Sequence, residues 1–318
     1  MPPHEKMPPL PSATVRRRSA SHDTPPPPPE PEYRLAAIEG TFAPDARPST
    51  PRTTPWFRDR AYYLDGWTDQ AIWRATLVET AGTAILVLIG GELSATIIGY
   101  NTPQIGAYIG ISTMLLLTTF IYATAPASGG HLNPLVSFAT MLTGLCPVPR
   151  AVLYMCGQTT GAALAAGVLT GVWGKERSIL LKGGGCFFDR ATLSQGQAVL
   201  NEAAICFGVL FLAFGIGLDP RAALLFGPRY GPMMVGVAMG VIAFATSGAV
   251  PGYTGAAMNP ARCFASGIVR RDMSDQWIWW VGPAAAALLY AALFNTVPPQ
   301  LMTPKGEGAA KKEGESLA

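Results

Sequence analysis

The sequence predicts an all-α membrane protein with six transmembrane helices and two shorter helices that enter the bilayer without crossing it. Hydrophobic residues make up 49% of the 318 positions and charged residues only 14%, whereas a soluble domain carries about a quarter charged residues. Six apolar stretches are long enough to span a bilayer, and two Asn-Pro pairs each open a shorter apolar segment. This composition argues against a soluble enzyme, and the net charge of +3 is too small to indicate a nucleic-acid-binding protein.

Both ends of the chain are polar, and we expect them to be disordered tails. Residues 1–60 include the run Pro25 to Pro29 and mix acidic with basic residues, so this segment has too little apolar surface to offset the entropy cost of folding. Residues 301–318 are similarly polar. The expected membrane domain therefore covers residues 61–300.

The six spans each contain about 20 mainly apolar residues, the length that crosses the hydrocarbon core as a helix. Six spans place both termini on one side of the membrane. The distribution of Lys and Arg favours the cytoplasmic side, and we expect the membrane to be the plasma membrane. The expected spans are roughly 75–98, 104–126, 150–173, 197–218, 230–250 and 276–297.

Two further apolar segments, 134–144 and 260–268, are too short to cross the bilayer. Each follows an Asn-Pro pair, at Asn133 or at Asn259. This pair favours the start of a helix, because Asn caps the first turn and Pro fits within it. A single Asn-Pro pair is typical of a loop turn, whereas two pairs at matching places indicate two re-entrant half-helices.

The chain contains an internal repeat, with halves at about 75–173 and 197–298. Each half opens with a span that begins near a carboxylate, Glu79 or Glu202, and the Asn-Pro pair follows at nearly the same interval. Three spans in each half give the halves opposite orientations, so the half-helices enter from opposite faces and meet at the midplane with their N-termini together. Inverted repeats with broken helices are typical of transport proteins.

Residues 128–134 (SGGHLNP) and 255–262 (GAAMNPAR) resemble the two signature loops of the major intrinsic proteins, the aquaporins and aquaglyceroporins. Residues 183–186 (GGGC) and 259–263 (NPARC) are similar to motifs of one subfamily from plants and fungi, the X intrinsic proteins. Leu135, which replaces the usual Ala after the first Asn-Pro, fits the same subfamily. The resemblance implies an aquaporin-like fold, a homotetramer with one pore in each subunit, and passive flow of water and small uncharged solutes, without a cofactor or metal ion.

The resemblance covers about residues 75–298 and also assigns positions in the pore. It places Arg262 in the narrow selectivity filter, although an Arg at membrane depth can instead pair with a buried carboxylate. Family offsets add Ala256, which lies within the second motif, and Thr113 and Ser247, which depend on helix register and can shift by one residue. The pore-midplane residues are Asn133, Pro134, Leu135, Asn259, Pro260 and Ala261.

The expected filter predicts which solutes pass. Thr113, Ser247 and Ala256 are all small, whereas water-selective relatives narrow this point with aromatic or His side chains. We therefore expect glycerol, and also urea, hydrogen peroxide or boric acid, to permeate, with water as a lesser substrate. Protons and ions are expected to be excluded.

Four polar residues are expected to support the two loops. Glu79 and Glu202 either accept hydrogen bonds from loop N–H groups, which must be satisfied at membrane depth, or couple transport to protons. We favour the first interpretation. We expect Gln158 to have a similar supporting role and His131 to brace its loop by a hydrogen bond rather than to sense pH.

Two other functions remain open. A proton-coupled secondary transporter also uses inverted repeats and broken helices. A membrane scaffold whose Pro-rich tail binds SH3-like modules is a third interpretation. Residues 16–19 (RRRS) resemble a kinase site, or alternatively form a solvated basic run that touches anionic lipid.

Cys186 and Cys263 are both expected on the outer side of the membrane, where a disulfide persists. Cys186 follows three glycines in the loop between spans three and four, and Cys263 directly follows Arg262. The glycines permit approach to the Cα separation of about 4.4–6.8 Å that a disulfide requires. The spacing alone is equally compatible with two free thiols.

Overall fold

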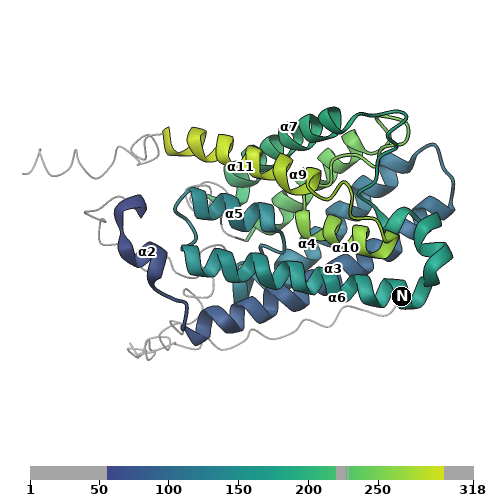
Figure 1. Cartoon of the computed structure of the whole chain (residues 1–318). Helices are drawn as coiled ribbons and strands as arrows, with labels where there is room; N and C mark the ends of the chain where they lie inside the picture. Colours follow the sequence, from purple (N-terminus) through teal and green to yellow (C-terminus); the bar gives the residue numbers. More distant parts are fainter. Residues whose placement is uncertain (1–55, 220–226, 228, 297–318) are drawn as a thin grey trace, which may run out of the picture.

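The computed structural model describes residues 56–219, 227 and 229–296, and within them the fold is helical (Figure 1). Six long helices correspond to the six expected spans, and two half-helices lie between them. The long helices are α3 (Gln70–Gly99), α4 (Ile105–Ser128), α6 (Val148–Leu180), α7 (Gln195–Ala213), α9 (Gly231–Thr246) and α11 (Ile278–Thr296). The half-helices are α5 (Pro134–Leu142) and α10 (Pro260–Arg270), and the short elements are η1 (Trp56–Arg58), α2 (Arg60–Leu64), η2 (Lys182–Gly184) and η3 (Phe214–Leu218).

The expected tails lie mostly outside the described residues, but residues 56–60 do not. Trp56 packs on the ring of Tyr62, with 5.0 Å between the ring centroids. The single O–H of Tyr62 lies within hydrogen-bond distance of two carbonyl oxygens, those of Met141 at 2.5 Å and Cys146 at 2.7 Å. Residues 56–60 are therefore held against the end of α5, and the expected tail boundary at residue 60 was wrong by about five residues.

The fifth span ends earlier than expected, whereas the regular backbone of the third breaks where its end was expected. The fifth was expected to reach residue 250, but α9 ends at Thr246 because Ser247 is extended, with ψ of 112°. Gly248 then takes a positive φ of 89° that continues the turn. The third span was expected to end at residue 173, and Gly174, with φ of 70° and ψ of 174°, breaks the helical backbone of α6 there.

Small residues let the long helices cross closely. A Cβ atom on Gly161 of α6 would overlap the main-chain carbonyl of Thr80 in α3, and one on Gly236 of α9 would overlap Thr118 in α4. Helix pairs in membranes approach through such small residues because lipid offers no hydrophobic driving force between them. The α3–α6 and α4–α9 pairs thus form compact walls around the half-helices.

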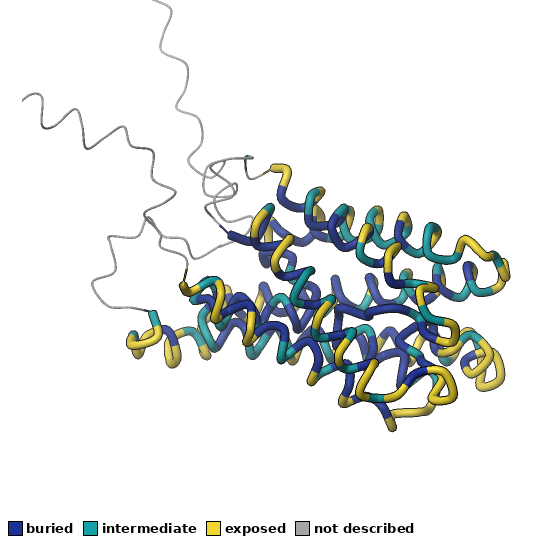
Figure 2. The backbone as a smooth tube through the Cα atoms, turned by 90° about the horizontal axis from the view of Figure 1, so that it is seen from above, coloured by how far each residue is buried: buried dark blue, intermediate teal, exposed yellow. Residues whose placement is uncertain are grey.

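The outer surface of the bundle is apolar. Five of the described helical segments are long and apolar enough to cross a membrane, while α9 is shorter. Figure 2 shows exposed residues along the outward side of the long helices and buried ones along their inward side. Among the exposed apolar side chains are Leu77, Ile111, Leu115, Leu164, Val172, Leu200 and Leu289. This distribution fits a lipid-facing surface.

Candidate pore and selectivity filter

The two half-helices begin at the two Asn-Pro pairs. The side-chain oxygen of Asn133 accepts a hydrogen bond from the N–H of Leu135, at 3.0 Å. Asn259 accepts from the N–H groups of Ala261 and Arg262, at 3.1 Å and 3.3 Å. Each Asn is thus the N-cap of its half-helix and satisfies N–H groups that have no partner within the helix.

Hydrogen bonds also join the start of each half-helix to the loop that precedes the other one. The amide nitrogen of Asn133 donates to the carbonyl oxygen of Met258, at 2.8 Å, and that of Asn259 donates to Leu132, at 3.0 Å. Leu132 and Met258 both have left-handed backbones, with φ of 51° and 59°. The matched geometry of the two loops follows from the inverted repeat.

Glu79 lies behind the first loop with no exposed surface. Its carboxylate accepts hydrogen bonds from the N–H groups of His131 and Leu132, at 2.9 Å and 2.6 Å. The Ser128 hydroxyl and the Gln158 amide also donate to it, at 2.6 Å and 2.8 Å. These four donors satisfy the buried carboxylate, which in turn provides an acceptor for two N–H groups of the irregular backbone that enters α5.

Glu202 has the matching position in the second half and is equally buried. It accepts hydrogen bonds from the N–H groups of Ala257 and Met258, at 2.7 Å and 3.4 Å. The Tyr253 hydroxyl donates to it at 3.1 Å and itself accepts from the Asn201 amide at 3.0 Å. The sequence did not predict a role for Tyr253. Its hydroxyl donates to Glu202 as the Ser128 hydroxyl donates to Glu79 in the first half.

His131 and Gln158 meet at one side chain on α5. The His131 Nδ1 atom lies 3.1 Å from the Ser137 hydroxyl, and the Gln158 amide donates to the same hydroxyl at 3.0 Å. The His131 ring also packs edge-on against Tyr154, whose hydroxyl donates to the Ser128 carbonyl at 2.7 Å. These contacts tie the first loop to α5 and α6.

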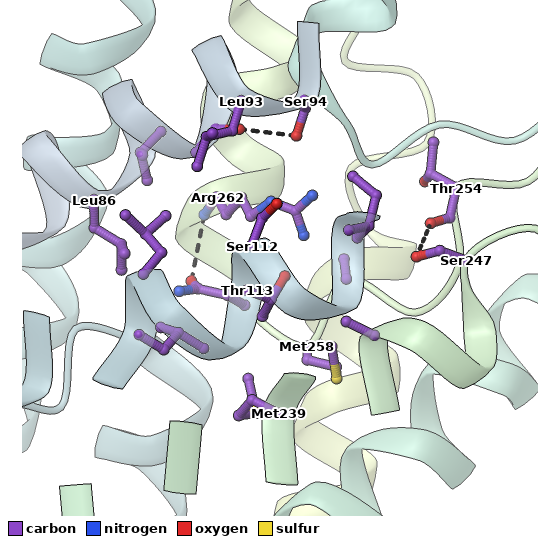
Figure 3. Close-up of a pocket in the computed structure, with 18 of the residues that line it drawn as sticks. Leu86, Leu93, Ser94, Ser112, Thr113, Met239, Ser247, Thr254, Met258 and Arg262 are labelled. Atoms are coloured by element: carbon purple, nitrogen blue, oxygen red, sulfur yellow. Dashed lines mark hydrogen bonds between the residues drawn. The ribbon is translucent and has the colours of Figure 1, made fainter. Parts of the chain in front are cut away.

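A cavity of about 90 Å³ is lined by both Asn residues and by all four expected filter residues. Figure 3 shows three of them, Thr113, Ser247 and Arg262, among the lining side chains. One part of its lining is apolar and comes mainly from α3 and α4. The polar part includes Arg262, whose side chain lies among these residues in Figure 3. The apolar lining comprises Leu86, Val87, Leu93, Ile97, Ile109, Leu116, Leu117, Met239, Ala243, Ala256, Ala257 and Met258.

The cavity also contains hydroxyl groups that sequence reasoning missed. Ser112 lines it beside Thr113, so an uncertainty of one residue at this position does not change the kind of side chain presented. Ser94 and Thr254 line it as well. Thr254 directly precedes the second signature loop, at the place that Ser128 has in the first half, so the repeat could have identified it. Nothing in the sequence near Ser94 marks that residue as part of a cavity.

A disulfide joins Cys186 to Cys263, with their Cα atoms 5.2 Å apart. Both residues are buried. Because Cys263 follows Arg262 in the first turn of α10, the disulfide attaches the loop after α6 to the half-helix directly beside the cavity.

A helical bundle in which two half-helices meet by their N-termini beside a lined cavity is the architecture of a membrane transport protein. The sequence model of the family described as Major intrinsic protein matches residues 66–294. The chain belongs to this family, and membership implies a passive channel for water and small solutes in an integral membrane protein.

Individual relatives agree with this assignment. The chain is 32% identical to Aquaporin-4 of Mus musculus over 233 residues, which cover 73% of this chain and 69% of that protein. It is 34% identical to the probable aquaporin PIP2-8 of Oryza sativa subsp. japonica over 235 residues, covering 69% and 81%. The solved aquaglyceroporin of Plasmodium falciparum has the same fold, with a TM-score of 0.61 at 19% identity over 73% of this chain and 98% of that one.

Proposed function

We propose that the protein is a passive channel for small uncharged solutes, chiefly glycerol, and also urea, hydrogen peroxide or boric acid, with water as a lesser substrate. The observation that carries the proposal is the lining of one cavity by Thr113, Ser247, Ala256 and Arg262. Three of these four side chains are small, so the filter is wide. Its hydroxyl groups and Arg262 face an apolar wall, and this pairing suits a solute that has both hydroxyl groups and carbon atoms.

The two Asn residues provide the next binding step along the pore. Each amide nitrogen has two N–H bonds, of which one is used across the loops. The second can donate to a passing hydroxyl or water and so replace part of its lost hydration. The apolar wall offers no competing partner, so the solute is not retained and flux continues.

Charged solutes meet two electrostatic barriers. The positive ends of the α5 and α10 dipoles meet at the Asn pair, and Arg262 adds a full positive charge in the filter. Both repel cations, and both disfavour transfer of a proton along a file of water molecules.

The main alternative is a proton-coupled transporter that uses Glu79 and Glu202. Both carboxylates already accept hydrogen bonds from backbone N–H groups of the loops, so a structural role accounts for them. We propose that Glu79, Glu202, Gln158 and His131 support the loops and do not move protons to the solute. The other alternative, a membrane scaffold whose Pro-rich tail binds SH3-like modules, predicts no solute flux at all.

The proposal also covers the subfamily, the oligomeric state, the membrane location and the two tails. The GGGC and NPARC motifs support assignment to the X intrinsic proteins, and Leu135 is consistent with it. We propose a homotetramer in the plasma membrane with cytoplasmic termini. The expected tails lie outside the described residues, apart from residues 56–60. We propose that the first tail offers a kinase site at residues 16–19 and Pro-rich ligands for SH3-like modules.

Stopped-flow light scattering on liposomes tests this function. Purified protein is reconstituted, and the permeabilities for water, glycerol, urea and hydrogen peroxide are compared with those of empty liposomes. The channel proposal requires glycerol flux that stops at equal concentrations on both sides. Accumulation of glycerol against its gradient when a proton gradient is imposed contradicts it and favours the transporter.

A further inference from the structure

One face of α10 holds the loop that follows α6. The Ser266 hydroxyl donates to the carbonyl of Gly185, and the Arg270 guanidinium donates to the carbonyl of Cys186 at 3.1 Å. The disulfide between Cys186 and Cys263 adds a covalent link on the same half-helix. Residues 183–186 are all buried, so this short segment is fixed along α10 rather than free in solvent.

Within this segment, Gly185 lies directly against Arg262. A Cβ atom at Gly185 would be 2.7 Å from the Nη2 atom of Arg262 and 3.5 Å from its Cζ atom. The backbone of Gly185, with φ of 140° and ψ of −171°, belongs to a region that other residues rarely occupy. The absence of a side chain at this position therefore leaves room for the guanidinium group.

Arg262 has no side-chain hydrogen bond to any residue in the described parts of the chain. Its guanidinium lies against the Gly185 backbone and lines the cavity, and it interacts electrostatically with the buried Glu202 carboxylate. A Cβ atom at Gly185 would come too close to the guanidinium, so one of the two must shift. Because the loop is held by Ser266 and by the disulfide, we expect the guanidinium to move, and the cavity is the open space beside it. The backbone of Gly185 thus sets the free width beside Arg262.

We infer that Gly185 is a specificity-determining residue: its bare backbone holds the Arg262 guanidinium back from the pore and keeps the filter wide enough for a three-carbon polyol. This inference rests on the proposed filter role of Arg262 and names the residue that positions it. Gly185 acts through Arg262 and does not itself bind the solute.

The test is Gly185→Ala, with glycerol and water permeabilities measured by stopped-flow on liposomes of equal protein content. A methyl-sized change in a closely fitting site discriminates between solutes by about tenfold or more. We therefore expect glycerol permeability to fall about tenfold relative to the parent, with a smaller loss for water. Unchanged glycerol permeability overturns the inference.

Gly174→Ala is the matched control for backbone strain. Gly174 also has a positive φ, of 70°, but a Cβ atom there meets nothing within 4 Å. We expect Gly174→Ala to keep the glycerol-to-water ratio of the parent. An equal change of the ratio in both variants attributes the effect to strain and contradicts a specific contact with Arg262.

A double variant distinguishes a narrowed filter from a general loss of folded, conducting protein. In Gly185→Ala with Arg262→Val, the displaced guanidinium is gone, so we expect glycerol permeability to return to that of the Arg262→Val single variant. Failure to recover overturns the inference. A parent protein that conducts neither glycerol nor water instead refutes the proposed function, so the two failures are distinguishable.

Discussion

The side-chain amide of Asn133 donates a hydrogen bond to the carbonyl oxygen of Met258, 2.8 Å away, across the junction of the two half-helices. The corresponding bond from Asn259 to Leu132 measures 3.0 Å. Each Asn caps its own half-helix through its oxygen and holds the opposite loop through its nitrogen. The junction is therefore stabilised by both halves of the chain together.

Replacing Asn133 separates these two roles. Ser caps a helix about as well as Asn but has no amide to reach Met258, whereas Ala loses both interactions. We expect Asn133→Ser to lower the apparent free energy of unfolding by about 1 kcal/mol and Asn133→Ala by about 2 kcal/mol. Thermal unfolding of the purified protein in detergent measures both, and equal losses would argue against the bond across the loops.

The width of the filter is tested by adding bulk. Ala256 and Ser247 line the cavity that contains Arg262, so Ala256→Phe and Ser247→His narrow it. We expect both variants to lose glycerol permeability before water permeability, because glycerol is the wider solute. Liposome stopped-flow with both solutes gives the ratio, and unchanged glycerol flux in both variants rejects this location for the constriction.

The part of Arg262 in excluding charge is tested by Arg262→Val. The variant removes the charge but leaves the two half-helix dipoles in place. We expect glycerol flux to stay near that of the parent while protons or small cations begin to leak. A pH-sensitive dye inside the liposomes reports the leak. Proton tightness equal to that of the parent means that the helix ends suffice and that Arg262 serves mainly as a hydrogen-bond donor.

The structural role of Glu202 is tested through Tyr253. Tyr253→Phe removes the hydroxyl that donates to Glu202 and accepts from Asn201, and we expect a loss of about 1 kcal/mol in unfolding free energy. All solute permeabilities should change in the same proportion. Tyr100→Phe is the control, because Tyr100 is exposed. An equal loss of unfolding free energy in Tyr253→Phe and Tyr100→Phe would contradict this role.

Local features of the sequence predicted most of the fold. Apolar runs of about 20 residues and the Asn-Pro caps act within one helix, and the structure has all six spans and both half-helices. The end of α9 was missed because Ser247 and Gly248 leave the helix within an apolar stretch. The sequence did not predict that Trp56 belongs to the folded domain. Trp56 packs on Tyr62, and the Tyr62 hydroxyl bonds to the end of α5. A contact between such distant segments has no local sequence pattern.

The cavity was less accessible to sequence reasoning. The internal repeat identifies Asn133 and Asn259, whereas Arg262 is identified by the resemblance of the second motif to the family's signature loop. Ser94 and Tyr253 depend on how helices and loops from different parts of the chain pack together, so no motif marks them. The sequence presents Gly185 only as one of three glycines before Cys186, and its contact with Arg262 exists only once the loop is folded onto α10.

The disulfide gives a last prediction. Cys186 and Cys263 are 77 residues apart in the sequence, and closing a loop of this length stabilises a folded chain by about 2–4 kcal/mol. We expect peptide mapping without reductant to find the 186–263 crosslink, and Cys186→Ala to lower the unfolding temperature in oxidising buffer but not in reducing buffer. Cys156→Ala is the control, because Cys156 is an exposed free thiol. Alkylation of both Cys186 and Cys263 in native, unreduced protein would show that the bond does not form.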